Sequence, residues 1–370
     1  MPIPQFKPQK LSAQFYRQLI RYLFLISILI IGFQFIVFVD QLDQGKVPDI
    51  SRPPGVEAFL PISALISLKY WLKTGILNEI HPSGLLILIF ICGSSLLLKK
   101  VFCSWICPIG LLNEWLSKLH LLIFRKGLRI HPVIDLPLRS LKYLLAFFFL
   151  WAVFFQMDVL SLEKFIYSPY NRMADIKMLK FFTEISATTF WVTSGLILLS
   201  VLIRDFWCRY LCPYGALLGA LSSLGIFKIR RDQITCTNCL RCDKICPSQI
   251  TVSKVSTVYS DECHACQKCV DICPEKETLI FSNTQKGLHL KATYIGIGLL
   301  LIFAGGSFLG RLTGNWQNNI SNKEYLYHSE RSHEFIYGHN RGAVPGYNRQ
   351  KLEAEILDFS KSSKNDQMIP

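Results

Sequence analysis

Cysteines supply most of the chemistry that this chain of 370 residues could perform, and 13 of them are present. Eight form two runs with one spacing, which are Cys236-x2-Cys239-x2-Cys242-x3-Cys246-Pro247 and Cys263-x2-Cys266-x2-Cys269-x3-Cys273-Pro274. In such a run, three thiolates reach the corners of one iron–sulfur cube and the fourth reaches a second cube. The usual alternative metal for paired cysteines is zinc. A zinc ion takes four ligands, usually in two Cys-x2-Cys pairs, which does not explain a third cysteine at the same spacing or the Cys-Pro that follows. The spacing therefore predicts two [4Fe–4S] clusters.

The crossed use of the fourth cysteine assigns ligands to each cluster. Cluster one takes Cys236, Cys239, Cys242 and Cys273, and cluster two takes Cys263, Cys266, Cys269 and Cys246. Two clusters in one small insert form an electron relay and do not by themselves transform a substrate. The pattern indicates no catalytic residue and no cofactor-binding residue beyond these ligands. Thiols with metal-ligand spacing also fit a reducing compartment such as the cytoplasm.

Four more cysteines form two Cys-x3-Cys-Pro pairs, each at the end of an apolar run. They are Cys103, Cys107, Cys208 and Cys212. Two cysteines four residues apart can share one helix face, but one pair offers too few ligands for a cube. Three interpretations stay open: the four bind a further metal centre, they form a redox-active thiol set, or they are buried small residues. Cys92 lies alone inside an apolar run, so we interpret it as a buried structural thiol.

Long apolar runs must position these motifs. Hydrophobic residues make up 51% of the chain, and crossing about 30 Å of hydrocarbon takes about 20 apolar residues. The sequence predicts five transmembrane helices, at Leu19–Val39, Pro82–Leu98, Leu141–Met157, Thr188–Ile203 and Ala292–Gly310. A sixth apolar stretch, Val56–Leu72, contains Pro61 and Lys69, so we expect it to be re-entrant or interfacial.

Positive charge lies on alternate loops. Residues 1–21, 99–142 and 204–291 carry net charges of +4, +6 and +4, which account for the whole formal charge of +14. The positive-inside rule places these loops and the N-terminus in the cytoplasm, and the C-terminus outside. Because the charge follows the helix ends, it indicates a multi-pass protein of the cytoplasmic (inner) membrane in contact with lipid. A nucleic-acid-binding protein would instead carry a separate basic surface.

An internal repeat organises the membrane part. The pattern aromatic-Cys-x3-Cys-Pro-x-Gly starts at Phe102 and recurs 105 residues later at Trp207, each time after a predicted helix hairpin. We expect four segments: a membrane domain with the duplicated hairpin and the first pair (1–203), a cytoplasmic segment with the second pair and the ferredoxin insert (204–291, insert at about 230–285), the last transmembrane helix (292–310) and a polar tail outside (311–370). The expected fold is mainly α, a polytopic helical membrane protein with a small α+β two-cluster ferredoxin-like insert.

Weaker signals lie outside the cysteine motifs. His81, at the outer end of the second run, could serve a quinone site or a haem, or be an interfacial histidine without a special role. The turn-rich segment Arg52–Pro61 leads into the kinked apolar stretch at the depth of quinone head groups, which makes a quinol pocket there a hypothesis. We expect His120 and His131 to be surface residues of a basic loop.

At these motifs the chain resembles the NapH/NosR-type membrane polyferredoxins, from about Arg21 to Gly310. That family joins a multi-helix membrane domain, two Cys-x3-Cys-Pro motifs and a two-cluster ferredoxin insert, and this sequence is most similar to the short NapH-like members. The resemblance implies electron transfer between the quinone pool and a partner redox protein, as a component of a quinol-linked oxidoreductase system. Two other functions stay open. One is a maturation or reductase factor that uses the Cys-x3-Cys-Pro thiols on a metal ion or disulfide, and the other is an Fe–S redox sensor.

Overall fold

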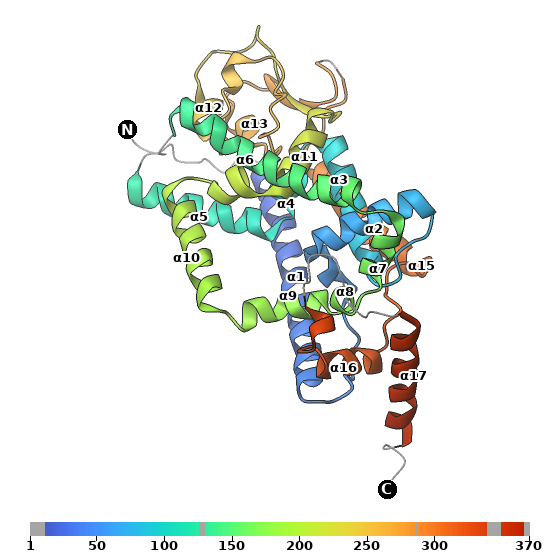
Figure 1. Cartoon of the computed structure of the whole chain (residues 1–370). Helices are drawn as coiled ribbons and strands as arrows, with labels where there is room; N and C mark the ends of the chain where they lie inside the picture. Colours follow the sequence, from blue (N-terminus) through green and yellow to red (C-terminus); the bar gives the residue numbers. More distant parts are fainter. Residues whose placement is uncertain (1–11, 126–129, 286, 339–348, 366–370) are drawn as a thin grey trace. The chain divides into compact units, whose positions relative to one another are not determined.

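Helices form most of the chain, and two short strands complete it (Figure 1). The computed structural model describes residues 12–125, 130–285, 287–338 and 349–365. Its α-helices are α1 (Ala13–Asp43), α2 (Pro61–Thr74), α3 (Pro82–Leu98), α4 (Val101–Trp105), α5 (Pro108–Phe124), α6 (Pro132–Trp151), α7 (Val159–Ile166), α8 (Pro169–Arg172), α9 (Ala174–Thr183), α10 (Ala187–Leu202), α11 (Pro213–Ser223), α12 (Arg241–Ile245), α13 (Lys268–Ile272), α14 (Ala292–Leu300), α15 (Gly306–Leu312), α16 (Asn322–Glu330) and α17 (Arg349–Asn365). The 3-10 segments are η1 (Pro54–Phe59), η4 (Val252–Lys254) and η6 (Phe335–Tyr337), and the π segments are η2 (Ala152–Gln156), η3 (Trp207–Leu211) and η5 (Leu301–Gly305). The mainly α expectation is confirmed. Residues 1–11 and parts of the expected polar tail lie outside the described residues.

Among the described residues, three helical stretches are long and apolar enough to cross a membrane. They are α1, Val133–Gln156 (α6 with η2) and Ala292–Leu312 (α14, η5 and α15). The pair α9 and α10, bent by 77°, would be a fourth if it forms one span. Helices α3 and α10 lie where the sequence predicted spans, but they have only 17 and 16 residues. At 1.5 Å per residue they reach about 25 Å, less than the roughly 30 Å of a hydrocarbon core. By length and composition, the expected five spans are therefore three or four.

The apolar stretch Val56–Leu72 is interrupted at Pro61, as its sequence suggested. Pro61 is the first residue of α2, where its missing N–H leaves no helical hydrogen bond unmade, and the 3-10 segment η1 precedes it. Lys69 of α2 is buried and donates to the backbone carbonyl of Val153 at 3.2 Å. With 14 residues, α2 is too short to cross a bilayer by itself.

The chain forms two compact units. Unit 1 consists of Met1–Ile26, Phe90–Phe148 and Phe190–Gly305, and unit 2 of Ser27–Ile89, Phe149–Thr189 and Gly306–Pro370. Buried Trp105, Ile229 and Phe281 belong to the hydrophobic core of unit 1. Buried Phe38 and Leu162 belong to the core of unit 2. All 12 cysteines that the sequence nominated as metal ligands lie in unit 1.

The ferredoxin insert contains the only strands in the described part of the chain. Strand β1 (Lys228–Arg231) pairs antiparallel with β2 (Leu279–Ser282), and Ile229 lies opposite Phe281. Both side chains are buried in the core of unit 1. The two strands therefore join the beginning of the insert to its end. The expected α+β character is confirmed.

Each Cys-x3-Cys-Pro motif joins an apolar helix to a helix that begins at the proline of the motif. In the first copy, the one-turn helix α4 follows α3, and Pro108 starts α5. In the second copy, η3 follows α10, and Pro213 starts α11. Proline is favoured at the first helical position because its fixed φ suits a helix and its lack of an N–H does no harm there. The sequence repeat is thus a repeat of local structure.

Candidate metal centres

The two halves of the ferredoxin insert have the same loop conformation. The cysteine runs start 27 residues apart, and α12 and α13 follow at equivalent positions. Asn238, Leu240, Ala265 and Gln267 have φ of 52°, 57°, 47° and 57°. Residues other than glycine rarely adopt this left-handed conformation. Turns of this kind direct successive backbone N–H groups inward, which forms anion-binding concavities at many Fe–S sites. Both loops are therefore shaped to hold a negatively charged group.

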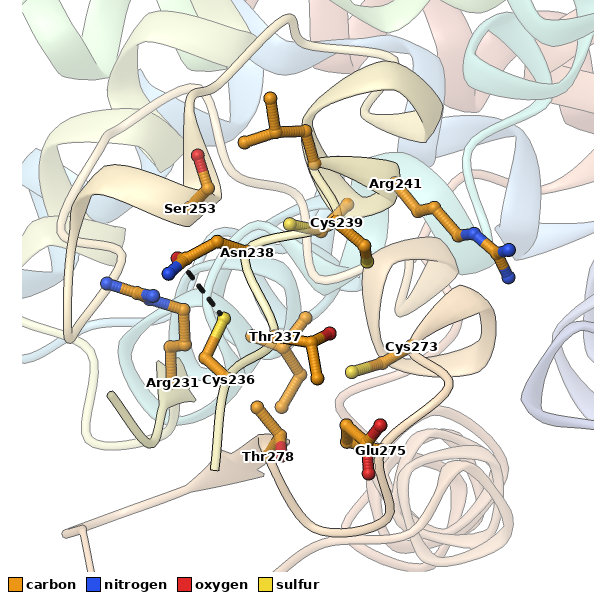
Figure 2. A pocket seen from close by; sticks show the side chains of 13 residues that line it. Arg231, Cys236, Thr237, Asn238, Cys239, Arg241, Ser253, Cys273, Glu275 and Thr278 are labelled. Carbon is orange, nitrogen blue, oxygen red and sulfur yellow. Dashed lines mark hydrogen bonds between the residues drawn. The ribbon is translucent and has the colours of Figure 1, made fainter. Parts of the chain in front are cut away.

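One cavity lies between the first run and the end of the second (Figure 2). It has a volume of about 370 Å³, and its lining includes Cys236, Cys239, Cys242 and Cys273. Figure 2 shows Cys236 and Cys273 pointing toward the hollow from opposite sides. Cys239 is exposed to solvent. The thiols predicted for cluster one thus surround one hollow at the protein surface.

A second cavity, also of about 370 Å³, is lined by Cys246, Cys263, Cys266 and Cys269. Apolar Ile229, Val252 and Val258 form part of its wall. The structure therefore groups the eight cysteines in the crossed arrangement, with the last cysteine of each run beside the other run. Equal volumes and equal donor sets fit two groups of the same kind.

The two cavities differ in how far their thiols are buried. The backbone N–H of Asn238 is the main cause that holds the pKa of Cys236 below its ordinary value. In the second cavity burial dominates and raises the pKa of Cys246 to about 12, although the N–H groups of Ile250 and Ser248 act in the opposite direction. Burial also raises the pKa of Cys269 well above its ordinary value. Burial also raises the pKa of Cys242 in the first cavity to about 11, so it is Cys236 and the exposed Cys239 that set the first cavity apart.

Helix α4 holds the loop of the second cavity. The Oγ of Ser104 donates to the carbonyl oxygen of His264 at 2.5 Å, and the Nε1 of Trp105 donates to that of Ala265 at 3.2 Å. Both carbonyls belong to the step between Cys263 and Cys266, and Trp105 is fully buried. The segment of chain between Cys103 and Cys107 is therefore bonded directly to a loop of the second cavity.

The second cysteine of each Cys-x3-Cys-Pro pair caps a helix. Cys107 is the N-cap residue of α5, and Cys212 is that of α11. The backbone N–H of Gly215 donates to the Sγ of Cys212 at 3.2 Å. Burial raises the pKa of Cys107, and the N–H groups of Gly110 and Ile109 act against that rise. Burial likewise raises the pKa of Cys212. Unpaired N–H groups at a helix start favour negative charge, so at both positions they offset part of the cost that burial imposes on a thiolate.

Glycine follows in each motif because the backbone passes close to itself. A Cβ built at Gly110 would overlap the carbonyl oxygen of Cys103 and lie 3.2 Å from its carbonyl carbon. At Gly215, a Cβ would lie 3.5 Å from the carbonyl oxygen of Cys208, which is an ordinary contact. The first copy of the motif is therefore folded more tightly than the second.

The two pairs lie together within unit 1. Helix α5 contacts η3, which contains Cys208. Burial raises the pKa of Cys103 to about 12, and negative charge at Cys107 and Cys212 adds to the rise. Burial also raises the pKa of Cys208 well above its ordinary value, with further contributions from the other three thiols. The contact between α5 and η3 therefore brings the two motifs near each other within unit 1.

Single-ion geometry is absent from the described residues, where no three His, Cys, Asp or Glu side chains converge closely enough to hold one metal ion. This holds for the ferredoxin cysteines as much as for the Cys-x3-Cys-Pro thiols.

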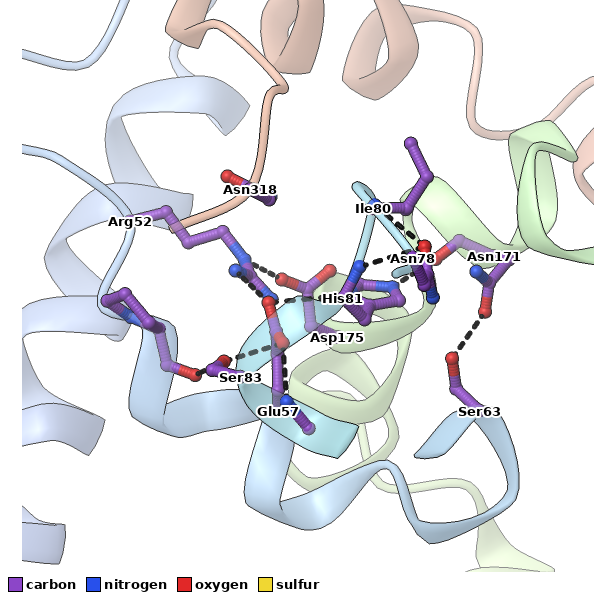
Figure 3. Close-up of polar contacts among 12 residues, drawn as sticks. Arg52, Glu57, Ser63, Asn78, Ile80, His81, Ser83, Asn171, Asp175 and Asn318 are labelled. Atoms are coloured by element: carbon purple, nitrogen blue, oxygen red, sulfur yellow. Dashed lines mark hydrogen bonds and ion pairs between the residues drawn. The ribbon is translucent and has the colours of Figure 1, made fainter. Parts of the chain in front are cut away.

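A buried polar cluster lies in unit 2 (Figure 3). Arg52 forms ion pairs with Glu57, at 2.8 Å, and with Asp175. The Oε1 of Glu57 lies 3.5 Å from the Nδ1 of His81, and its Oε2 accepts from the Oγ of Ser83 at 2.6 Å. Two carboxylates thus meet one guanidinium. A proton on His81 would make the cluster neutral.

His81 and Glu57 are both almost completely buried. The Nε2 of His81 lies 2.7 Å from the carbonyl oxygen of Asn171. Burial opposes ionisation of Glu57, but Arg52 and His81 together hold the pKa of Glu57 below its ordinary value. The structure therefore joins the two segments that the sequence singled out, and it adds Asp175, which no local motif marks.

Three remaining residues have less to contribute. Cys92 is half-buried in α3, where the sequence predicted a buried thiol, and its structural role stays a prediction. His120 is fully buried, with its Nδ1 2.8 Å from the carbonyl oxygen of Val201, so the expectation of a surface residue is wrong. The reason is that His120 lies on the packed face of α5. His131 is exposed, as expected.

Comparison with known proteins supports these assignments. A family model described as "4Fe-4S binding domain" matches residues 80–131 and 186–232, and each stretch contains one Cys-x3-Cys-Pro pair. A "4Fe-4S dicluster domain" model matches residues 228–274, which contain all eight ferredoxin cysteines. No solved structure matches the chain.

Related proteins share this combination of parts. The chain is 37% identical to an Escherichia coli K12 protein named "Putative electron transport protein YccM", over 75% of this chain and 78% of that one. It is 27% identical to "Ferredoxin-type protein NapH" of Haemophilus influenzae, over 40% of this chain and 48% of that one. It is 28% identical to "Regulatory protein NosR" of Pseudomonas aeruginosa, over 46% and 24% of the two chains. The chain therefore belongs to the family of ferredoxin-type membrane proteins that includes YccM, NapH and NosR.

Proposed function

We propose that this protein carries electrons between the quinone pool of the cytoplasmic membrane and a partner redox protein. The ferredoxin-type domains and the candidate membrane spans support electron transport at a membrane. The observation that carries the proposal is a pair of cavities in one insert, each lined by four thiols, with exposed Cys239 at one of them. Such a pair suits a relay that links a buried site to the surface.

The ligands follow from the lining of the cavities. Cluster one is held by Cys236, Cys239, Cys242 and Cys273, and cluster two by Cys263, Cys266, Cys269 and Cys246. When bound, each [4Fe–4S] cluster accepts or donates one electron. The protein holds the thiolates in place and directs backbone N–H groups at them. It therefore sets the distance between the clusters and the polarity around each one.

The partner redox protein meets the chain at cluster one. Cys239 is exposed, whereas no ligand of cluster two among the described residues is fully exposed. Ile234, two residues before Cys236, and Leu240, directly after Cys239, are 95% and 48% exposed. Apolar side chains around an exposed redox centre suit a short-lived contact with another protein, since association removes them from water.

The quinone end of the relay needs groups that exchange protons, because a quinol loses two protons with its two electrons. Unit 2 offers such groups in Glu57 and His81, whose facing atoms are 3.5 Å apart. Arg52 keeps the nearby negative charge stable in a buried position. An imidazole that faces a buried carboxylate is a suitable proton acceptor, and the carboxylate orients the imidazole and stabilises the proton it receives. We therefore assign quinol deprotonation to the polar cluster of unit 2.

The charge distribution sets the orientation. With the basic loops inside, the ferredoxin insert and the N-terminus face the cytoplasm, and residues 311–370 face outside. In this orientation, cluster one is available to a cytoplasmic partner.

The main rival function is reduction of an external disulfide or metal ion by the Cys-x3-Cys-Pro thiols. Such a reaction uses an accessible thiolate of lowered pKa. Burial raises the pKa of Cys103 to about 12. Burial and the other three thiols raise the pKa of Cys208 well above its ordinary value. These properties favour the relay.

Quinol-dependent reduction of the clusters tests the proposal. Full-length protein is purified anaerobically in detergent, and its cluster absorbance is followed after addition of a reduced quinol analogue. We expect bleaching in the wild type and in Glu79→Gln, since Glu79 is an exposed carboxylate two residues from His81. Glu57→Gln should slow bleaching by about 100-fold, the lower end of the range for general acid–base groups.

Dithionite serves as the control for cluster integrity in every variant. Bleaching by dithionite but by no quinol would disprove the quinone link. Equal rates for Glu57→Gln and wild type would move the proton acceptor away from the polar cluster of unit 2.

A further inference from the structure

We propose that helix α5 (Pro108–Phe124) lies in the membrane interface, with its apolar face among lipid acyl chains and its basic end at anionic phospholipid head groups. The charge pattern alone assigned residues 99–142 to a cytoplasmic loop. With 17 residues, α5 is not one of the candidate spans in the described part of the chain. The inference uses side chains of unit 1 only. The choice of the cytoplasmic leaflet rests on the orientation under the proposed function.

The outward face of α5 is apolar. Exposed residues at intervals of three or four lie on one side of a helix, and here they are Leu112, Trp115, Leu119 and Leu122. Leu122 is 77% exposed. Single exposed apolar residues are common on protein surfaces, but a continuous apolar surface marks a site of contact with a protein or a membrane. The apolar face of α5 extends over about three helical turns.

The inward face of α5 carries polar side chains that are buried in unit 1, namely Asn113, Ser117 and His120. The Oγ of Ser117 donates to the carboxylate of Asp205 at 3.3 Å, and the Nδ1 of His120 lies 2.8 Å from the carbonyl oxygen of Val201. A surface helix in water shows the reverse arrangement, with polar side chains outward. In contact with hydrocarbon, polar side chains face the protein interior, where they find partners. The arrangement of α5 is therefore that of a helix beside lipid.

Positive charge gathers in the C-terminal half of α5 and just beyond it. Residues 115–134 contain no acidic residue and four basic ones, which are Lys118, Arg125, Lys126 and Arg129. The side chains of Lys118 and Arg125 are exposed. Anionic head groups attract basic segments at a membrane surface, and a tryptophan such as Trp115 is favoured at that depth. A symmetric dimer through this face would instead bring two such basic segments together.

Helix α5 also bonds to the ferredoxin insert. Glu114 forms an ion pair with Lys268 at 2.8 Å, and Lys268 lies between Cys266 and Cys269 of the second run. Glu114 also pairs with Arg17 of α1, at 3.0 Å. The lipid contact of α5 therefore anchors the loop of the second cavity at the membrane surface. In the proposed relay, cluster two is then the cluster nearer the lipid.

Photo-cross-linking to lipid tests the position of α5. Full-length protein is reconstituted anaerobically into vesicles of phosphatidylglycerol and phosphatidylcholine in equal parts, with benzoylphenylalanine in place of Leu119. The same substitution at Leu29 of α1 provides a lipid-facing control, and at Ile234 of the insert a water-facing control, since both side chains are exposed. After illumination, lipid joined to the chain is measured by mass spectrometry. Cluster absorbance shows that each variant is folded.

We expect Leu119→benzoylphenylalanine to capture lipid about as well as the Leu29 variant, and at least about fivefold better than the Ile234 variant. A yield equal to that of the Ile234 variant would overturn the proposal. A cross-linked pair of chains in place of lipid would overturn it as well, because the face would then be covered by a second copy.

The head groups have their own readout in the Leu119 variant. Phosphatidylglycerol should predominate in the captured lipid, and adding Lys118→Gln/Arg125→Gln should make the capture of the two lipids equal. Adding Lys276→Gln, at an exposed lysine of the insert, should leave the preference unchanged. Equal capture of the two lipids without these changes would overturn the assignment of anionic head groups. None of these measurements uses quinol, so this inference and the proposed function can fail separately.

Discussion

Gly110→Ala should destabilise the protein, while the same change at the equivalent Gly215 should not. The new methyl group at Gly110 would overlap the carbonyl oxygen of Cys103. That atom belongs to the backbone, so it cannot rotate away as a side chain could. At Gly215, the nearest atom to the new methyl carbon is a carbonyl oxygen at 3.5 Å, where no movement is needed.

The magnitudes come from two opposing terms. Extra atoms in a packed site cost about 1–3 kcal/mol, and overlap with backbone places Gly110 near the upper end. Replacing glycine by alanine inside a helix contributes up to about 1 kcal/mol in favour of folding. The expected net loss is about 2 kcal/mol for Gly110→Ala. Gly215→Ala should be neutral or stabilising by up to about 1 kcal/mol.

Thermal unfolding in one detergent, followed by tryptophan fluorescence under anaerobic conditions, measures this difference. The two variants differ by about 2–3 kcal/mol, which corresponds to roughly 4–12 °C between their midpoints. Iron content is measured on the same samples, so that cluster loss is not mistaken for unfolding. The close backbone approach at Cys103 would be refuted if the two midpoints lay within about 1 °C of each other. A midpoint for Gly215→Ala below that of Gly110→Ala would refute it as well.

Three further predictions concern the clusters, the orientation and a buried ion pair. Cys246→Ser should impair the cluster held by Cys263, Cys266 and Cys269 and leave the other spectroscopically intact; damage to the other cluster would contradict the crossed assignment. A reporter fused after Gly287 should lie in the cytoplasm and one fused after Trp316 outside, and one compartment for both would mean that Ala292–Leu312 does not span. Lys142→Met leaves the buried Glu262 with Lys100, at 3.9 Å, as its remaining partner and should cost about 3 kcal/mol in chemical unfolding, the lower end of the range for a broken buried pair. Arg139→Met, whose side chain is 32% exposed, should cost less than about 1 kcal/mol, and equal costs would show that burial does not govern these pairs.

The cysteine chemistry could be predicted from the sequence because ligand spacing is a local property. Three thiolates within seven residues must surround one point, and the following Cys-Pro must lead away from it. The lining of the two cavities reproduces this grouping. Apolar runs likewise marked α1 and the stretch Ala292–Leu312, since burial in hydrocarbon requires a long uninterrupted sequence of apolar residues.

Helix length, which composition does not give, decides whether an apolar run can cross a membrane. The runs at Pro82–Leu98 and Thr188–Ile203 are apolar enough to be spans, but their helices are only 17 and 16 residues long. The bend of 77° before α10 could not be foreseen from hydropathy, because hydropathy does not record helix direction.

Only the tertiary structure brought distant residues together. Arg52 and Asp175 are 123 residues apart and form a buried ion pair, although neither has a neighbour in sequence that predicts it. His120 is buried for a similar reason, since its position on α5 faces other parts of unit 1. The two Cys-x3-Cys-Pro motifs could be paired by their repeat, but the hydrogen bonds from α4 to a loop of the second cavity could not be foreseen from it. Spacing along the chain determines which atoms one short loop can present. Which loops meet is decided by the burial of apolar surface over the whole fold, and one sequence motif carries no record of that.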